Sequence, residues 1–400
     1  MSDDELRVVL YSHDSQGLGH TRRNLALARA LAEHLPALTG RRVTGMLLTG
    51  VDTTFPGWPE GFDRVVLPGI RKSPDGYAPR HLDVGMAQLT SLRSGLLDAA
   101  LRGFEPHLVI VDRHPWGVDR ELEEPLLRLR AERPGTVVVL GLREVLDAPE
   151  AAAREWVALG DLAPVRRVYD QVWVYGDPAV HDPVTTGEIP AELAGLVRYT
   201  GYLATGRTPG ARACDADRPY VLSMAGGGSD GLALTLAAVR ARVPRGYGHV
   251  VITGPQMPAE HVAQVRQAAA PGTLVLPSVP DALAEVLDAS AVVSMGGYNS
   301  VAEILATNTP ALLVPRERPR HEQRIRAESL RSQGAVDVLP AGSLTSTAIG
   351  AWLEDVVGTV QLRRHLDRGG LRAVPQLAAR LLGGAPVAAG RGAVRAAGAR

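Results

Sequence analysis

Hydrophobic and polar positions divide the chain into two alternating kinds of segment. Short runs of β-branched and aliphatic residues predict buried strands, and the longer stretches between them carry apolar residues at helical spacing. One such helix is expected from Thr21 to Leu35, where the apolar stripe is formed by Leu25, Ala28, Ala32 and Leu35. This alternation is typical of βα units built around a parallel sheet.

The pattern predicts two successive series of such units. Helices are also expected over Ala87–Leu101 and Arg120–Arg133. The expected strands of the first series are Arg7–Ser12, Val43–Thr49, Arg64–Leu67, Leu108–Asp112, Thr136–Leu140 and Gln171–Tyr175. Those of the second series are Tyr220–Met224, Val250–Thr253, Leu274–Pro277, Ala291–Ser294 and Ala311–Val314.

A change in composition separates the two series. Residues 204–219 are rich in glycine, proline and charge without apolar periodicity, which predicts an interdomain linker. We therefore expect an α/β fold of two Rossmann-like domains, residues 1–203 and 220–382. A tail over residues 383–400, rich in Gly, Ala, Pro and Arg, is expected to be disordered.

The charge balance argues against a nucleic-acid partner. With 43 basic and 43 acidic residues the formal net charge is zero, so no global field collects polyanions. The single cysteine, Cys214, forms no internal disulfide, and no apolar run approaches the roughly 20 residues of a membrane-spanning helix. The acidic N-terminus leads directly into a strand, without a secretory signal. These features predict a cytoplasmic protein, one that could also dock peripherally at the inner face of a membrane.

A glycine-rich loop with a histidine follows the first expected strand. Gly19 and His20 lie where this strand passes into a helix, at the sheet edge where open α/β folds bind ligands. The near-neutral pKa typical of histidine suits His20 to take a proton from a hydroxyl. Asp14 and His13 are candidates to orient it. On spacing alone, His20 is equally compatible with a polar helix start, and Asp14 with a loop cap.

The second half carries two glycine-rich turns and two polar candidates. A helix beginning near Asn299 would direct free amides at a diphosphate. Glu303, one turn beyond Ser300, is placed to accept both ribose hydroxyls, and Gln323 to bridge sugar hydroxyls. Taken singly, Glu303 and Gln323 are better explained as solvated surface residues, and only their joint order and spacing favour a ligand site. The turns contribute Gly227, Gly228 and Ser229, then Gly296, Gly297, Asn299 and Ser300.

Together these motifs resemble the glycosyltransferases related to the peptidoglycan-precursor N-acetylglucosaminyltransferase, the MurG-like family of GT-B architecture. The resemblance rests on residues 12–23 (SHDSQGLGHTRR), 174–178 (VYGDP), 199–202 (YTGY), 295–303 (MGGYNSVAE) and 321–323 (HEQ). It spans almost the whole chain and implies an active site in the cleft between the two domains.

The resemblance also implies roles for individual residues. His20 would be the base or acceptor contact, and Glu303 would bind the donor ribose. Ser300 with the amides of Gly296 and Gly297 would bind the diphosphate, and Glu322 and Gln323 the transferred sugar. The loop containing Val279 would line the base pocket. Two positions depart from the family, which commonly carries His or Arg in place of Met295 and Asn in place of Arg326.

The acceptor side carries no motif that identifies its ligand. Arg71, Arg80 and Arg113 follow expected strands and are candidates to contact an anionic or polyhydroxylated acceptor, although solvated surface arginines are the common case.

The expected reaction transfers a hexose or N-acetylhexosamine from a nucleotide-diphosphate sugar, with UDP favoured, to an acceptor hydroxyl with inversion. The acceptor is undetermined, and membrane-associated compounds are included. Neither a metal nor another cofactor is expected, because helix-start amides can stabilise the leaving diphosphate. The alternatives are a sugar-nucleotide epimerase of the same architecture and a noncatalytic nucleotide-sugar-binding protein.

Overall fold

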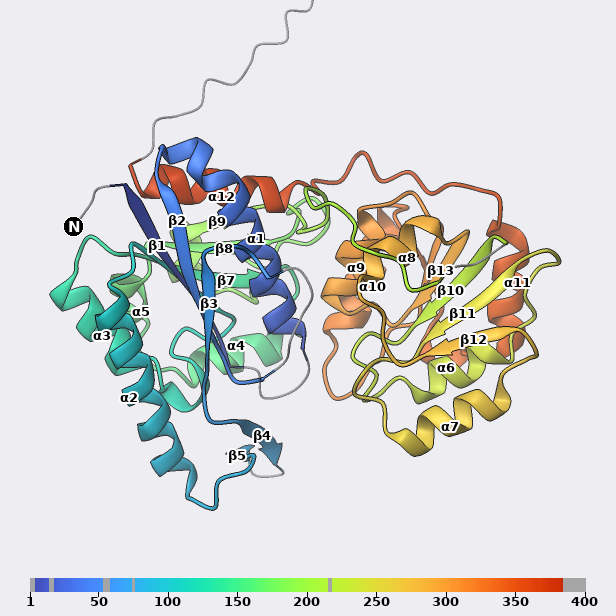
Figure 1. Cartoon of the computed structure of the whole chain (residues 1–400), viewed down its shortest axis with the longest axis horizontal. Coiled ribbons are helices and arrows are strands. Elements are labelled where there is room, and N and C mark those ends of the chain that lie inside the picture. Colours follow the sequence, from blue (N-terminus) through green and yellow to red (C-terminus); the bar gives the residue numbers. More distant parts are fainter. Residues whose placement is uncertain (1–3, 14–17, 53–57, 74–75, 215–217, 384–400) are drawn as a thin grey trace, which may run out of the picture.

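The computed structural model describes residues 4–13, 18–52, 58–73, 76–214 and 218–383. The chain forms two α/β units lying side by side, each built around one parallel sheet (Figure 1). This confirms the expected α/β class with two Rossmann-like units. The expected tail lies outside the described residues, apart from Gly383.

The first unit contains a seven-stranded parallel sheet in the order β3-β2-β1-β6-β7-β8-β9. Its strands are β1 Glu5–Ser12, β2 Arg42–Thr49, β3 Phe62–Val66, β6 Leu108–Asp112, β7 Val137–Arg143, β8 Gln171–Tyr175 and β9 Val197–Tyr199. Its helices are α1 Gly19–Thr39, α2 Met86–Phe104, α3 Glu123–Glu132, α4 Pro149–Val157 and α5 Ala163–Val168, with short 3-10 turns η1 Val118–Arg120 and η2 Ala191–Leu196.

The second unit contains a six-stranded parallel sheet in the order β12-β11-β10-β13-β14-β15. Its strands are β10 Tyr220–Met224, β11 Gly248–Ile252, β12 Thr273–Leu276, β13 Ala291–Ser294, β14 Ala311–Leu313 and β15 Asp337–Val338. Its helices are α6 Leu232–Val239, α7 Ala259–Ala268, α8 Ala282–Asp288, α9 Tyr298–Leu305, α10 Glu322–Ser332 and α11 Ser346–Val356, with the turn η3 Ala341–Ser343.

A small antiparallel hairpin was not expected from the sequence. Its strands, β4 Ile70–Ser73 and β5 Gly76–Pro79, project from the first sheet on the side of the second unit (Figure 1). Both strands are short and largely polar, so neither shows the apolar run by which the buried strands are recognised. Figure 1 places this hairpin beyond the edge of the main sheet.

The last helix returns to the first unit. Helix α12, Gly370–Leu381, packs along α1, and Leu371, Val374 and Ala378 join the same buried cluster as Leu27 and Leu31 (Figure 1). The range 220–382 expected for the second domain therefore includes a helix whose packing partner is α1. Its Leu, Val and Ala stripe reveals an amphipathic helix but not which sheet it covers.

The chain crosses between the units twice, and the two crossings run side by side. The amide of Tyr202 donates to the carbonyl of Asp367 at 2.9 Å, and that of Thr205 to the carbonyl of Arg368 at 2.9 Å. The segment after β1 and the helix start after β13 meet between the units, where the Asn299 side chain contacts Gly19. In the described part of the chain, no helix combines the length and apolarity needed to cross a membrane.

Candidate functional site

The histidine at the start of α1 is held by a carboxylate from a neighbouring strand. His20 Nδ1 contacts the carboxylate of Asp112, the last residue of β6. Arg23, one turn further along α1, donates to the two oxygens of that carboxylate at 2.7 and 2.6 Å. An ionised Asp112 can only accept, so the imidazole proton lies on Nδ1 and Nε2 is the basic nitrogen.

Asp112 is fully ionised in this setting. Burial disfavours its charged form, but the charges of Arg23 and His20 and their hydrogen bonds outweigh that effect and hold the pKa of Asp112 well below its usual range. Asp112 is not among the residues expected from the sequence to orient His20, which were Asp14 and His13. Asp14 lies outside the described residues. The sequence signal that could have indicated Asp112 is its place at the end of an expected strand, since that strand could lie beside the first one.

Two further imidazoles pack around His20. The ring of His13 meets those of His20 and His114 edge to face, with centroids 4.7 and 5.0 Å away. Burial, followed by the charge of His20, lowers the pKa of His13, and burial with Arg113 lowers that of His114. Both rings are therefore neutral near pH 7. Among the described residues, no group of three or more His, Cys, Asp or Glu side chains is placed to hold a metal.

The two glycine turns of the second unit lie side by side because β10 and β13 are neighbours in the sheet. A Cβ placed on Gly226 would be 3.8 Å from Ser300 Oγ, and one on Gly228 would lie 2.4 Å from the carbonyl oxygen of Thr253. Gly228 thus allows the close approach of two loops. Gly227 and Ser229 are exposed between them.

Helix α9 begins directly after the second turn, and Glu303 lies within it. Gly297 is its N-cap without a side-chain hydrogen bond, so the first amides of the helix have no capping side chain. Glu303, whose side chain is 16% exposed, lies 3.5 Å from the guanidinium of Arg207 in the interdomain crossing. Burial raises the pKa of Glu303, although the charges of Arg207 and Arg22 oppose this.

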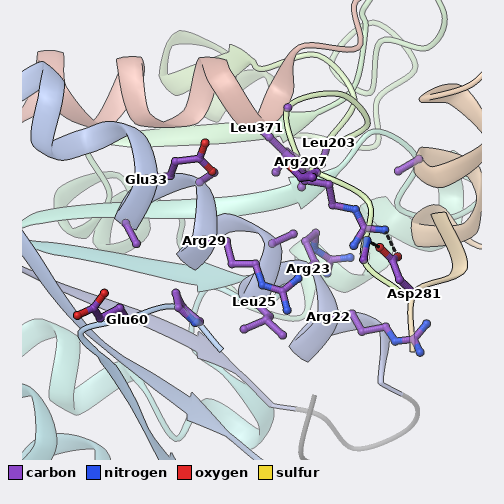
Figure 2. A pocket seen from close by; sticks show the side chains of 18 of the residues that line it. Arg22, Arg23, Leu25, Arg29, Glu33, Glu60, Leu203, Arg207, Asp281 and Leu371 are labelled. Atoms are coloured by element: carbon purple, nitrogen blue, oxygen red, sulfur yellow. Dashed lines mark hydrogen bonds and ion pairs between the residues drawn. The ribbon is translucent and has the colours of Figure 1, made fainter. Parts of the chain in front are cut away.

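Glu303 opens into a cavity of about 980 Å³ in the described part of the chain. Figure 2 shows this cavity between α1, which contributes Arg22 and Arg29, and the crossing that carries Arg207. Arg207 also binds Asp281 at 2.7 Å, in the loop before α8. Val279, expected near the nucleotide base, is partly buried in the same loop. The cavity thus has the size of a small-molecule site and is lined by both units.

The two residues expected at the transferred sugar lie at the start of α10. Glu322 and Gln323 are 3% and 8% exposed. Glu322 Oε1 accepts from Arg316 at 2.6 Å, whereas its Oε2 is buried with no partner in the described structure. The oxygen of the Gln323 amide accepts from the backbone of Arg316. The start of α10 adjoins that of α9, because a Cβ on Gly296 would lie 3.9 Å from the Gln323 carbonyl oxygen.

Direct contacts join the loops of the two units. The Asn299 side-chain amide donates to the carbonyl oxygen of Gly19 at 3.0 Å. This bond brings the helix start expected to hold the diphosphate against the helix start that carries His20. The Tyr298 hydroxyl donates to the carbonyl of Tyr175 at 2.8 Å across the same boundary.

Arg326, at the position where the family has Asn, forms a buried ion pair between the units. Its guanidinium binds the carboxylate of Glu144 at 2.6 and 3.2 Å, and both side chains are fully buried. It also donates to the carbonyl of Gly296 at 3.2 Å. No local pattern indicates this pair, since Glu144 and Arg326 belong to different units.

The three arginines expected at the acceptor behave differently from one another. Arg71 and Arg80 each donate to a carbonyl oxygen of their own hairpin. Arg113 is buried and paired with Glu155. All three arginines therefore interact with other residues of this chain in the structure.

Comparison with known proteins agrees with this geometry. Residues 226–364 match the model of the glycosyltransferase family 28 C-terminal domain, which contains both glycine turns, Glu303, Glu322 and Gln323. The chain is 27% identical over 194 residues to the UDP-N-acetylglucosamine--N-acetylmuramyl-(pentapeptide) pyrophosphoryl-undecaprenol N-acetylglucosamine transferase of Lactiplantibacillus plantarum. That alignment covers 46% of this chain and 49% of the relative, so the chain spans about half the length of this relative.

Solved structures share the whole fold. The calicheamicin glycosyltransferase CalG4 superposes with a TM-score of 0.59 at 18% identity, covering 96% of this chain and 99% of that one. Acinetobacter baumannii MurG gives a TM-score of 0.55 at 16% identity, covering 93% and 98%. The fold is thus that of the GT-B glycosyltransferases. Residues 226–364 are similar to the family 28 C-terminal domain, and part of the chain is similar to MurG-type transferases, in line with the resemblance noted in the sequence.

Proposed function

We propose that the protein is a glycosyltransferase that moves a hexose or N-acetylhexosamine from a nucleotide-diphosphate sugar, with a UDP-sugar favoured, to an acceptor hydroxyl. The observation that carries this proposal is the juxtaposition of two helix starts. Asn299 at the start of α9 touches Gly19 at the start of α1, with the His20–Asp112 pair on one side and Glu303 on the other. A donor on α9 would therefore face a base across the cleft.

The donor site is assigned to the second unit. The carboxylate of Glu303 accepts the ribose hydroxyls, and the free amides at the start of α9 face the diphosphate, with Gly296, Gly297 and Ser300 around it. The turn of Gly227, Gly228 and Ser229, in which Gly227 and Ser229 are exposed, borders the same place. Glu322 and Gln323 bind the transferred sugar. The unpartnered Oε2 of Glu322 supports this role, because a buried carboxylate oxygen without a donor is costly until a ligand hydroxyl supplies one.

The reaction is a single displacement at the anomeric carbon with inversion. His20 Nε2 takes the proton of the acceptor hydroxyl as the oxygen bonds to the anomeric carbon. The bond from that carbon to the diphosphate breaks, and its electron pair leaves with the diphosphate. Asp112 stabilises the imidazolium that forms and fixes its orientation. Amides at the helix start provide the electrostatic stabilisation, so no resident metal is required.

The acceptor class is proposed from the Lactiplantibacillus plantarum relative, whose name specifies a pyrophosphoryl-undecaprenol acceptor. A hydroxylated acceptor attached to a membrane lipid would place the protein in the cytoplasm, at the inner face of the membrane. Arg71 and Arg80 on the hairpin are the residues proposed to meet such an acceptor at the edge of the cleft.

A donor screen tests the function. UDP-, dTDP- and GDP-sugars are added to the wild type, to Glu303→Gln and to the control Glu354→Gln on α11, and thermal unfolding is followed. A donor at 100 times its Kd should stabilise the wild type and the control by about 2.7 kcal/mol, and Glu303→Gln less. Stabilisation by none of these donors would refute the proposal. Conversion of the sugar nucleotide without an acceptor would favour an epimerase.

A further inference from the structure

One arginine at the carboxyl end of β7 forms no ion pair in the described part of the chain, although the charge of Glu322 acts on it. Arg143 is the last residue of β7, and its Nε is buried without a hydrogen-bond partner. No carboxylate in the described part of the chain forms a salt bridge with it. By contrast, five other arginines of this region each form an ion pair with a carboxylate: Arg23, Arg113, Arg316, Arg320 and Arg326. Arg143 is therefore available to an anion from outside the chain.

Arg143 shares a face of the sheet with Asp112, the partner of the proposed base His20. Strands β6 and β7 run parallel with Asp112 opposite Gly141, and residues two apart on a strand point to the same face. Asp112, which contacts His20, thus lies on one face of the sheet with Gly141 and Arg143. The hydroxyl of Tyr175 lies against Gly141, in the space where a Cβ would be.

The residues directly after Arg143 dock on the proposed donor site. Glu144 binds Arg326, which in turn donates to the carbonyl of Gly296 at the beginning of the second glycine turn. Asp147 accepts from the amide of His321, the N-cap of α10, at 2.8 Å. The carboxyl end of β7 is therefore held between the base and the starts of α9 and α10.

The family position that commonly carries a cation cannot supply one here. Met295 is 6% exposed and packs in the apolar core of the second unit with Val293 and Val314. Within the second unit, the diphosphate would therefore meet the helix-start amides but no side-chain charge from this position. We infer that Arg143 supplies such a charge from the opposite unit, by binding the β-phosphate of the nucleotide diphosphate. This inference rests on the proposed function.

The electrostatics around Arg143 agree with this role. Burial, followed by the charge of Arg326, lowers the pKa of Arg143 to about 9, although the charge of Glu322 opposes this. A buried guanidinium that forms no ion pair gains from a phosphate, which it can bind through two parallel hydrogen bonds. As the anomeric bond breaks, its electron pair passes to the β-phosphate oxygen beside Arg143, while the acceptor proton passes to His20. Arg143 thus stabilises charge that grows in the transition state.

The affinity difference between a nucleoside diphosphate and its monophosphate measures this interaction. Calorimetric titration is done with UDP and UMP, or with the dTDP/dTMP or GDP/GMP pair if that base binds the wild type better. The proteins are the wild type, Arg143→Gln, Arg143→Lys and the exposed control Arg166→Gln on α5. Arg143→Gln should lower the diphosphate affinity roughly ten- to hundredfold and leave the monophosphate unchanged. Arg143→Lys should lie between, since it keeps the positive charge but cannot form the two parallel hydrogen bonds.

Each result decides the matter. An unchanged diphosphate-to-monophosphate ratio in Arg143→Gln overturns the inference while leaving the proposed function standing, and a raised acceptor KM in that variant would assign the charge to the acceptor instead. Failure of every diphosphate to bind the wild type refutes the proposed function itself. If Arg143→Gln does not fold, a wild-type structure with the diphosphate decides, since the inference requires a β-phosphate oxygen within hydrogen-bond distance of Arg143.

Discussion

The carboxylate of Asp112 lies against Nδ1 of His20, although 92 residues separate them in the chain. His20 begins a helix after β1 and Asp112 ends β6, and the two strands are neighbours in the sheet. The register of two buried strands therefore builds the pair. It turns a histidine in a glycine loop into an oriented base.

Replacing the base should separate chemistry from binding. His20→Ala should reduce the transfer rate by about 10²- to 10⁴-fold, because a positioned general base contributes that much, and leave the donor Kd unchanged. Initial-rate assays with an active acceptor, together with donor titration, measure both. His261→Ala, on α7, is the matched control. Full activity in His20→Ala would remove this histidine from the mechanism.

Asp112→Asn should cost stability as well as activity. It leaves the guanidinium of Arg23 buried without a charge partner, so the free energy of unfolding should fall by about 3–5 kcal/mol. Urea denaturation measures this.

The Asp112 carboxylate should also make the free energy of unfolding depend on pH. The pKa of Asp112 is lowered on folding, so its ionised form stabilises the protein above the unfolded pKa, and that stability is lost as the pH falls toward the folded value. The Asp112→Asn variant should therefore lose less stability than the wild type between roughly pH 6 and pH 3, because ordinary carboxyl groups titrate in this range. Parallel pH curves for the two proteins would argue against a buried, ionised Asp112.

The long buried strands could be predicted from the sequence, whereas the short strands β4, β5, β9 and β15 and the contacts between the units could not. Apolar runs such as Gln171–Tyr175 and Tyr220–Met224 match their strands because a buried parallel strand is marked by its own composition. Helix α12 and the pair Glu144–Arg326 depend on partners far away in the chain, and local patterns contain no information about such partners.

The same limit applies to the site. Each glycine turn could be predicted because it lies in a single connection between a strand and the next helix, and Glu303 follows the second turn within a few residues. Asp112, Arg143 and Arg207 act through neighbours on other strands or in the interdomain crossing, so only the sheet order reveals them.

Glu303→Gln should weaken donor binding in a pH-dependent way. Losing the charged acceptor for the ribose should raise the donor Kd roughly tenfold or more. Burial raises the pKa of Glu303 above its ordinary value of 4.5, so the wild-type affinity should decline on acidification at a higher pH than an ordinary glutamate would cause. Glu303→Gln should lack this decline. Titrations at several pH values test both, and an equal pH dependence in the two proteins would exclude Glu303 as the titrating group.

Removing one partner of the buried Glu144–Arg326 ion pair should lower the free energy of unfolding, whereas replacing both partners by apolar residues should lower it little. Glu144→Ala leaves Arg326 uncompensated, and the free energy of unfolding should fall by about 3–5 kcal/mol. The double variant Glu144→Met and Arg326→Met should recover most of that loss, since apolar residues of similar size often substitute for a buried pair without penalty. Denaturation of the single and double variants gives the coupling energy. Additive effects would mean that the pair does not act as a unit.

The central claim is that a nucleotide-diphosphate sugar lies between α9 and the start of α1. A crystal structure of the wild type with a donor that binds in the screen tests it most directly. The account predicts the ribose hydroxyls on the Glu303 carboxylate, the diphosphate at the first amides of α9, and the anomeric carbon facing His20 Nε2. A bound donor that contacts neither Glu303 nor the start of α9 would contradict it.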